Sequence, residues 1–322
     1  MASSFKTLTA NDIVSTRNLL HESIPITGTI ISGTYGTYPN GNNIKNYSHG
    51  MFQSVYDYPY LSSSANHIFD LTAGYAATSS LSSSTAAQNA KKINIYNEMA
   101  QVLVGFDENG NLRRFDKDGD LTGGQKINEA LFVNFTRLLA KDEIKKGSFS
   151  MTVGVAMGVS SSMTGTAIIK DTNAENVYKV NSPVGEYGIL YLTNSSGAKN
   201  QLTYTGSTTD GVVGPGLPCG LVYYQAGIAV LTASVFGSLI SASLQPLFDP
   251  YGATAVDQAV RNTLVTASIS GSANALRHRI ANIQFNNTTE LNSTVYFCRA
   301  NHNEFNYSSN KTYLSASRLV VK

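Results

Sequence analysis

The middle third of the chain, AIIKDTNAENVYKVNSPVGEYGILYLTNSSGAKNQLTYTGS (residues 167–207), decides the fold class. Short runs of Ile, Val, Leu, Tyr and Thr alternate there with polar residues, and clusters of Asn, Gly and Ser separate the runs. Alternation is typical of half-buried strands, and such clusters are typical of tight turns. The stretch therefore predicts a succession of short strands.

Strands are also predicted on both sides of this stretch. SFSMTVGV (148–155) and the tail IQFNNTTELNSTVYFCR (283–299) have strand composition, and residues 25–61 combine Thr/Ile/Tyr runs with Gly and Pro-Asn-Gly turns. ALFVNFTRLL (130–139) fits a strand or a helix equally well. Hairpin-type turns are expected around Asn109-Gly110 and Asp118-Gly119.

Helices are predicted in four places. KKINIYNEMAQVLVGF (91–106) has apolar residues at helical spacing and a stop at Gly105, and the other three are residues 7–24, 253–268 and 272–280. Strands along the whole chain with three or four helices predict an α+β fold, mostly antiparallel β-sheet and sandwich-like.

We expect a single structural unit over residues 1–322. A subdivision would place a helix/strand region at 1–125 and a β-rich region at 126–322. The chain shows no sustained repeat, which disfavours a solenoid or propeller.

The composition is polar but weakly charged. Only 14 % of the 322 residues are charged, against about 25 % in a typical soluble domain, and the net charge is +2. With no Lys/Arg-rich block, nucleic acid is not an expected partner. The longest apolar stretch, residues 220–236, falls short of the roughly 20 residues that cross a bilayer, and the N-terminus does not resemble a secretory signal. We expect no membrane association and synthesis in a cytoplasm.

The motif FDKDGDL (115–121) raises the question of a calcium loop. Counted from Asp116, carboxylates stand at positions 1, 3 and 5, as in an EF-hand. Position 6 is Leu121 instead of Gly, and position 12 is Ile127 instead of Glu. The motif is therefore interpreted as a solvated turn, and no metal ligand is predicted.

Cys298 and His302 raise the question of a zinc or catalytic pair. A zinc site needs three or four ligands, and the other cysteine, Cys219, has no histidine near it in sequence. Residues four apart on a strand lie about 13 Å apart, too far to share a proton. TVYFC is interpreted as a strand with an apolar thiol packed in a sheet, and both cysteines as reduced. Nucleophile elbows and phosphate-binding Gly motifs are missing, so no catalytic residue and no cofactor is predicted.

Tyrosine is unusually abundant, with 18 Tyr and 13 Phe but no Trp. Tyr gives large contact area with a polar tip, which suits protein–protein interfaces, although Tyr with Asn and Ser also stacks on sugars or bases. Two stretches concentrate these residues, MFQSVYDYPYL (51–61) and ANHNEFNYSSNKTYL (300–314). The predicted interface residues are Tyr56, Tyr58, Tyr60, Phe305, Tyr307 and Tyr313.

Several long strings carry a family resemblance. They are NIKNYSHGMFQSVYDYPYLSSSANHIFDLTAGY (43–75), KKINIYNEMAQVLVGFD (91–107), DEIKKGSFSM (142–151), NSPVGEYGILY (181–191), VYYQAGIAVLTASVF (222–236) and residues 275–314. Together they resemble virion structural proteins of large contractile-tailed phages, especially those of marine cyanobacteria. In such proteins, further β-rich sequence follows the position where this chain stops.

The resemblance implies a structural subunit of the virion, in the tail, baseplate or neck. Its partners would be other copies of itself and other virion proteins, and it would carry out no chemical reaction. The alternatives are a capsid-associated protein and a receptor- or carbohydrate-binding tail module. An intracellular enzyme has no motif in its favour.

Overall fold

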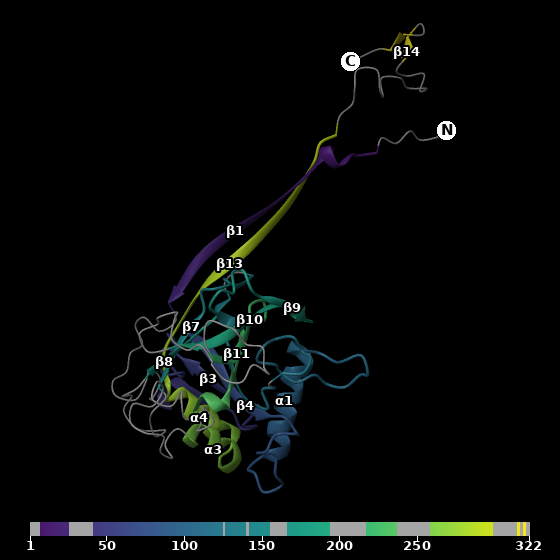
Figure 1. Ribbon diagram of the computed structural model, residues 1–322. Helices are drawn as coiled ribbons and strands as arrows, with labels where there is room; N and C mark the ends of the chain where they lie inside the picture. The colour runs from purple at the N-terminus through teal and green to yellow at the C-terminus, as the bar shows by residue number, and fades with distance from the viewer. Residues whose placement is uncertain are drawn as a thin grey trace. The chain divides into compact units, whose positions relative to one another are not determined.

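The computed structural model describes residues 7–25, 41–124, 126–139, 142–154, 166–193, 217–236, 258–298, 314–315 and 318–319. Figure 1 shows the chain as a ribbon. The helices are α1 (Asn89–Leu103), α3 (Gln258–Thr266) and α4 (Ile269–Arg277), with short 3₁₀ turns at Ala10–Asp12, Gly41–Asn43, Thr136–Leu138 and Ala233–Phe236. The strands are β1 (Ile13–Pro25), β2 (Ile44–Asn46), β3 (Gln53–Tyr56), β4 (His67–Tyr75), β5 (Glu129–Asn134), β6 (Glu143–Ile144), β7 (Ser150–Gly154), β8 (Thr166–Lys170), β9 (Lys179–Ser182), β10 (Gly185–Thr193), β11 (Leu217–Tyr223), β12 (Ile228–Thr232), β13 (Ile280–Tyr296), β14 (Leu314–Ser315) and β15 (Arg318–Leu319).

One large sheet joins 13 of these strands. Its order is β1-β13-β7-β8-β10-β11-β12-β5-β4-β3-β2, with β6 beside β13 and β9 beside β10. The pairings from β7 through to β2 are all antiparallel. The predicted α+β class, mostly antiparallel sheet with three helices, is confirmed.

Apolar side chains fill both faces of the sheet because its central strands are buried on both sides. Along β5, Leu131 and Val133 belong to one core cluster, whereas Ala130 and Phe132 belong to the other. Successive residues of a strand point to opposite faces. The sequence of residues 130–139 fitted a strand or a helix because it begins with a continuous apolar run. That run, residues 130–133, is a fully buried strand.

The sheet curls, so strands far apart in its order meet in one core. The ring of Phe135, which follows β5, lies 5.9 Å from Phe69 of β4, 5.9 Å from Phe149 and 5.6 Å from Phe285 of β13. β4 and β13 stand near opposite ends of the strand order. Packing of the two ends of this curled sheet around one core gives the fold its sandwich-like character.

Helix α1 crosses β4 at a glycine. A Cβ atom on Gly74 would lie 2.5 Å from the Lys92 carbonyl oxygen and 3.0 Å from the Tyr96 nitrogen, so only glycine allows this approach. Helix α1 ends where the sequence predicts, because Gly105 adopts a φ of +78°. Tyr96 continues into the core, and its hydroxyl donates to the Ile127 carbonyl at 2.6 Å.

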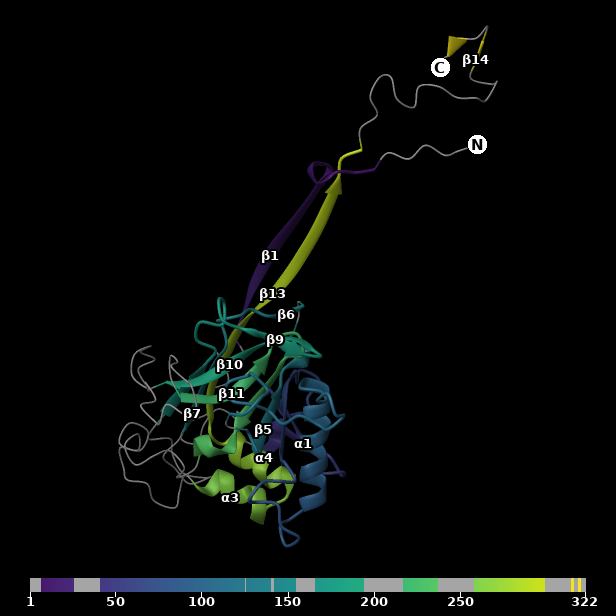
Figure 2. The ribbon, with the colours of Figure 1, turned by 45° about the vertical axis from the view of Figure 1, so that its right-hand side comes forward.

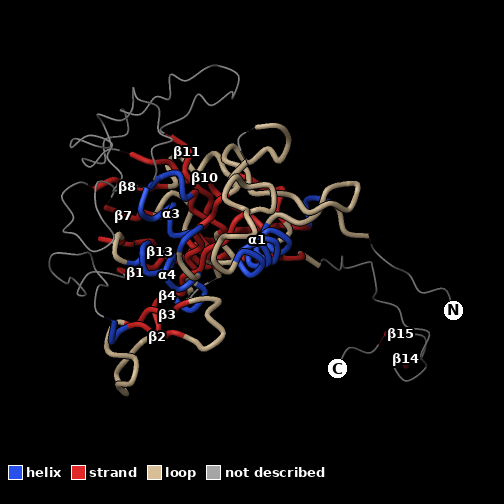
Figure 3. The backbone as a smooth tube through the Cα atoms, turned by 90° about the horizontal axis from the view of Figure 1, so that it is seen from below, coloured by secondary structure: helices blue, strands red, loops and turns tan. Residues whose placement is uncertain are grey.

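Helices α3 and α4 lie side by side, and α3 is tied to the start of α1 (Figures 1 and 3). The buried Lys92 ammonium donates to the carbonyls of Leu264 (2.6 Å) and Ala267 (2.7 Å), at the end of α3. In return, the Ile269 amide that opens α4 donates to the Gln88 side chain at 2.9 Å. The two predicted helices at 253–268 and 272–280 are thus present, with bounds a few residues different.

The chain divides into two compact units. One comprises residues 1–20 and 290–322, and the other comprises residues 21–289. The boundary suggested at 125 lies inside the second unit, where β4 pairs with β5 across it.

The predicted helix at residues 7–24 is wrong. Apart from the turn Ala10–Asp12, residues 13–25 form β1, which pairs with β13. The β-branched Ile13 and Val14 favour this extended form, and the apolar spacing of the segment fits both structures. Among the described residues, none of the helices is long and apolar enough to span a membrane.

Candidate functional sites

Three of the predicted interface tyrosines lie at the end of β3 and on the loop that follows it. Tyr56 ends β3, and its ring centroid lies 6.3 Å from that of Tyr60 and 5.3 Å from that of His67. Tyr58 and Tyr60 are exposed, and so is Leu61, which shares a turn with Tyr60. The structure therefore brings Tyr56 and Tyr60 together at the surface.

The tyrosine loop is held rigidly by one aspartate. Asp57 Oδ1 accepts from the Tyr58 amide at 2.8 Å and from the Asn66 amide at 2.6 Å, and its Oδ2 accepts from the Asn66 side chain at 2.8 Å. A fixed aromatic surface loses little entropy when a partner binds. Phe305, Tyr307 and Tyr313 lie outside the described residues.

A second surface is the terminal ribbon, which we define as residues 13–20 of β1 and 290–296 of β13 (Figure 2). Ser15 Oγ lies 3.1 Å from Thr294 Oγ1, and Thr16 Oγ1 lies 2.6 Å from Ser293 Oγ. Because residue numbers rise along one strand while they fall along the other, the two strands are antiparallel. This register places Val14 beside Val295 on the same face as Thr16.

Apolar side chains stand exposed on both faces of the terminal ribbon. Val14, Val295 and Leu291 occupy one face and Ile13 and Tyr296 the other, and all five are between 38 and 58 % exposed. Among the described residues, β13 pairs with β7 and β6 only over residues 280–288, so the ribbon has no third strand. A two-stranded ribbon with bare apolar faces is marginally stable in water. A partner that covers these faces would stabilise it.

A polar network of Tyr, Ser, Asp and His crosses β3 and β4. Asp70 Oδ1 accepts from Ser54 Oγ at 2.6 Å and contacts His67 Nε2 at 2.7 Å, while Tyr47 Oη lies 3.2 Å from Ser54 Oγ. In a hydrolytic triad the imidazole stands between serine and carboxylate. Here the carboxylate stands between Ser54 and His67, so the histidine cannot take the serine proton. The network is structural in its geometry.

Asp70 also borders a cavity of about 490 Å³ between the sheet and α1. Its lining is mostly apolar, and thioether and aromatic groups face a few carboxylate, amide and imidazole groups. Such a cavity suits a small ligand with an apolar body and a hydroxyl or amine. The lining residues are His49, Met51, Phe52, Asp70, Thr72, Ile95, Glu98, Met99, Phe132 and Asn134.

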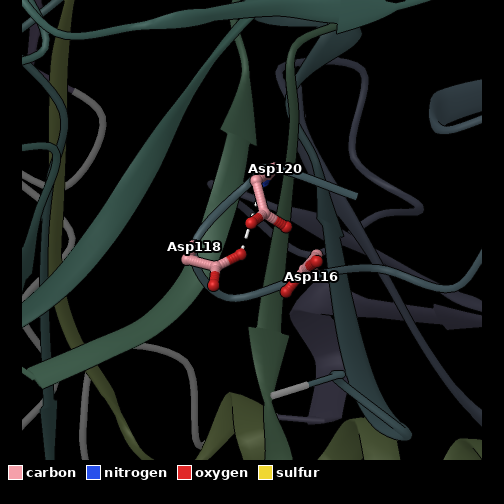
Figure 4. A group of neighbouring side chains, drawn as sticks. All are labelled: Asp116, Asp118 and Asp120. Atoms are coloured by element: carbon pink, nitrogen blue, oxygen red, sulfur yellow. Dashed lines mark hydrogen bonds between the residues drawn. The ribbon is translucent and has the colours of Figure 1, made fainter. Parts of the chain in front are cut away.

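Three carboxylates converge on the loop that follows Phe115. Figure 4 shows Asp116, Asp118 and Asp120 turned toward a common space, and one oxygen of each lies within 4.8 Å of one oxygen of the other two. Asp116 is completely buried, Asp118 is half-buried and Asp120 is exposed. The alternate spacing places every second side chain on the inner side of the turn.

The charge of this acidic loop is partly balanced by one lysine. Lys126 Nζ donates to Asp116 Oδ2 and, at 2.8 Å, to the Thr122 carbonyl. Asp116 Oδ1 is buried and has no hydrogen-bond partner. Burial, opposed by the lysine, raises the pKa of Asp116 to about 6.

The acidic loop is anchored to the sheet by its own backbone. The Gly119 carbonyl accepts from the Tyr187 hydroxyl at 3.1 Å and from the Asn181 amide at 3.0 Å. Gly119 has a φ of +70° and Leu121 a φ of +66°, so the chain turns sharply on either side of Asp120. Leu121 thus adopts the left-handed conformation that a glycine supplies at position 6 of a calcium loop. Leu121, which the sequence predicts to be incompatible with a calcium loop, therefore has the backbone conformation that such a loop needs.

The cysteine prediction is wrong in one respect. Cys298 is exposed and follows the end of β13, so its thiol is not packed in a sheet, whereas Cys219 is buried in β11. Both thiols are free. Burial raises the pKa of the Cys219 thiol, which makes it unreactive. His302 lies outside the described residues.

No family model matches the chain, and the comparisons with curated proteins and with solved structures find no match either. The function has therefore to be inferred from the residues and surfaces described above.

Proposed function

We propose that this chain is a structural subunit of a tailed-phage virion that assembles through protein–protein contacts in the tail, baseplate or neck. The observation that carries the proposal is the terminal ribbon, whose apolar side chains stand exposed on both faces. The assignment to a phage particle is supported by the resemblance of long stretches of the sequence to virion proteins of contractile-tailed phages. Attachment to the capsid, or carbohydrate recognition in the cavity beside α1, are the alternative proposals.

A neighbouring copy of the same chain is the partner we propose for the terminal ribbon. The ribbon contains one basic residue, Arg17, and one acidic residue, Glu290, with Ser, Thr, Asn and apolar residues between them. Two such surfaces meet without repulsion between like charges. Among the described residues no third strand lies beside the ribbon, and strand addition is a common route of assembly.

The fixed tyrosine loop offers a second contact surface. Tyr58 and Tyr60 expose aromatic area at a position braced by Asp57. Aromatic residues are enriched in interface cores. Two separate adhesive surfaces on one subunit allow each copy to touch more than one neighbour, as rings and helical assemblies require.

Sedimentation of the purified chain tests the ribbon contact. We expect concentration-dependent oligomers, and a Val14→Ser/Val295→Ser variant that associates about tenfold to a hundredfold more weakly, because the two valines contribute about 1.5–3 kcal/mol when covered. The matched control, Val177→Ser/Val180→Ser, changes two exposed valines of the other unit and leaves association unchanged.

Two outcomes would contradict the proposal. One is a chain that stays monomeric at every concentration reached, and the other is its absence from purified particles analysed by mass spectrometry. Equal association of the two valine double variants would instead exclude the ribbon as the contact. The virion role would then be decided by the mass spectrometry of purified particles alone.

A further inference from the structure

We propose that Asp116, Asp118 and Asp120 form a binding site for a divalent hard cation of the calcium type. This inference is independent of the proposed virion role. Two oxygens bound to one Ca²⁺ at about 2.4 Å lie at most about 4.8 Å apart. The three carboxylates meet this limit, because one oxygen of each lies within 4.8 Å of one oxygen of the other two.

A buried oxygen without a partner points to the cation. Asp116 is completely buried. Its Oδ2 accepts a hydrogen bond from the Lys126 ammonium, whereas its Oδ1 receives no hydrogen bond. A carboxylate oxygen left in this state lacks the compensation that buried charge normally receives. A bound cation would provide that compensation.

The unpartnered oxygen faces the other carboxylates. A Cβ atom built on Gly124 would lie 3.2 Å from Asp116 Oδ1 and 2.7 Å from Asp118 Oδ2, so both oxygens border the same small space. Gly124 has a φ of +64° and no side chain, and the space therefore stays open. Figure 4 shows Asp120 closing the third side.

Charge favours a cation. The three carboxylates and the Lys126 ammonium that contacts Asp116 sum to two negative charges, and Lys117, the other lysine of the loop, brings the net charge of residues 116–126 to −1. The oxygen-only donor set selects Ca²⁺ or Mg²⁺ over zinc, which prefers nitrogen and sulfur. Ca²⁺ accepts irregular coordination, whereas Mg²⁺ demands a strict octahedron, so three carboxylates on an irregular loop suit Ca²⁺ better.

The ammonium of Lys126 competes with a bound cation for two oxygens of the site. Its ammonium contacts Asp116 Oδ2 and the Thr122 carbonyl, which are the oxygens at positions 1 and 7 of a calcium loop. Position 12, where a calcium loop supplies a bidentate carboxylate, is the buried Ile127. With fewer ligands and an internal cation, we expect a dissociation constant of about 10⁻⁴ to 10⁻³ M, as in weak extracellular calcium modules.

Calorimetric titration of the full chain with CaCl₂, and separately with MgCl₂, tests the site. We expect one saturable calcium site, and loss of measurable binding in Asp118→Asn/Asp120→Asn, whose changes are isosteric and lie on half-buried and exposed positions. Asp107→Asn is the matched control. Asp107 lies in the preceding turn, where the Asn109 and Asn111 amides already bond its carboxylate, and its substitution leaves calcium binding unchanged.

Lys126→Met separates cation binding from a purely structural loop. Without the competing ammonium, we expect at least about fivefold tighter calcium binding and a larger rise in melting temperature on adding CaCl₂. A loop that only needs Lys126 as a brace would instead lose stability without gaining calcium affinity. The proposal is overturned if neither the natural chain nor Lys126→Met binds calcium saturably, or if Asp118→Asn/Asp120→Asn binds it as the natural chain does.

Discussion

Removal of the buried Lys92 ammonium should destabilise the junction between α1 and α3. Lys92 is completely buried, and its Nζ donates to the carbonyls of Leu264 and Ala267. The last carbonyls of a helix have no partner within the helix, and a positive charge there also interacts favourably with the helix dipole. Lys92→Met keeps most of the side-chain volume and removes both bonds.

The magnitude follows from two opposing contributions. Two charge-assisted hydrogen bonds contribute about 1.5–3 kcal/mol each, so their loss costs roughly 3–6 kcal/mol. Burial lowers the pKa of Lys92 from 10.5 to about 8, which corresponds to about 3 kcal/mol of desolvation that the methionine no longer carries. The net decrease in the free energy of unfolding is the difference of these two contributions, about 0–3 kcal/mol and centred on about 1.5 kcal/mol.

Lys91→Met is the matched control in a urea-unfolding assay at pH 7. Lys91 is exposed, and its one long contact is to the His49 carbonyl at 3.4 Å, so the free energy of unfolding should change by less than about 0.5 kcal/mol. Hydrogen exchange provides a second readout, because amides of α3 and the start of α4 should lose protection only in Lys92→Met. Equal unfolding curves for the two variants would refute the role of Lys92 at the end of α3.

Two further predictions concern the core. Asp171 is buried, accepts from the Gly147 amide and the Tyr224 hydroxyl, and has its pKa raised by burial to about 7. The folded state therefore holds its proton more tightly than the unfolded state, and stability should fall by up to about 4 kcal/mol as the pH rises from about 4 to about 7. Asp171→Asn should remove this fall, and urea unfolding at pH 4 and pH 8 measures it; an equal fall in both proteins would contradict the assignment. Gly74→Ala should lower the free energy of unfolding by about 1–3 kcal/mol because its Cβ meets the backbone of α1, whereas Gly41→Ala, with open space around it, should change it by less than about 0.5 kcal/mol. Equal melting temperatures for the two alanine variants would show that α1 does not pack so closely on β4.

Local sequence patterns predicted the elements whose partners are near in the chain. The turns at Gly110 and Gly119 adopt positive φ, as their Asn-Gly and Asp-Gly dipeptides indicate. Helix α1 and its stop at Gly105 follow from apolar spacing and from glycine's conformational freedom. These signals act over a few residues, so the sequence alone is enough to detect them.

Elements with distant partners could not be predicted in the same way. Residues 13–25 are a strand because β13 pairs with them, and more than 250 residues separate the two strands. The apolar spacing of the segment suits a helix and a strand alike, and tertiary pairing decides between them. Cys298 was misplaced for a related reason, since alternation does not tell where a strand ends.

The acidic loop shows a different limit of sequence reasoning. Leu121 adopts the left-handed backbone conformation, which non-glycine residues rarely take. The residues next to it in the sequence do not predict this conformation. Bonds from outside the loop, from Tyr187 and Asn181 to the Gly119 carbonyl, hold the turn before Leu121, and the Thr122 amide donates to Asp120 Oδ1 within the loop. A motif test that requires glycine at position 6 therefore rejects a loop whose backbone follows the expected path.

The long sequence separation between the two strands of the terminal ribbon bears on the proposed assembly. Its two strands cannot pair until residues 290–296 have been synthesised, and closing so long a loop is slow. The central sheet and helices, by contrast, are made from residues 21–289. We therefore expect the adhesive faces of the ribbon to form after the rest of the subunit has folded, which keeps incomplete chains from joining the assembly. This order of folding also explains why a marginally stable ribbon can carry exposed apolar residues. The ribbon becomes adhesive only when a folded neighbour is present to cover those residues.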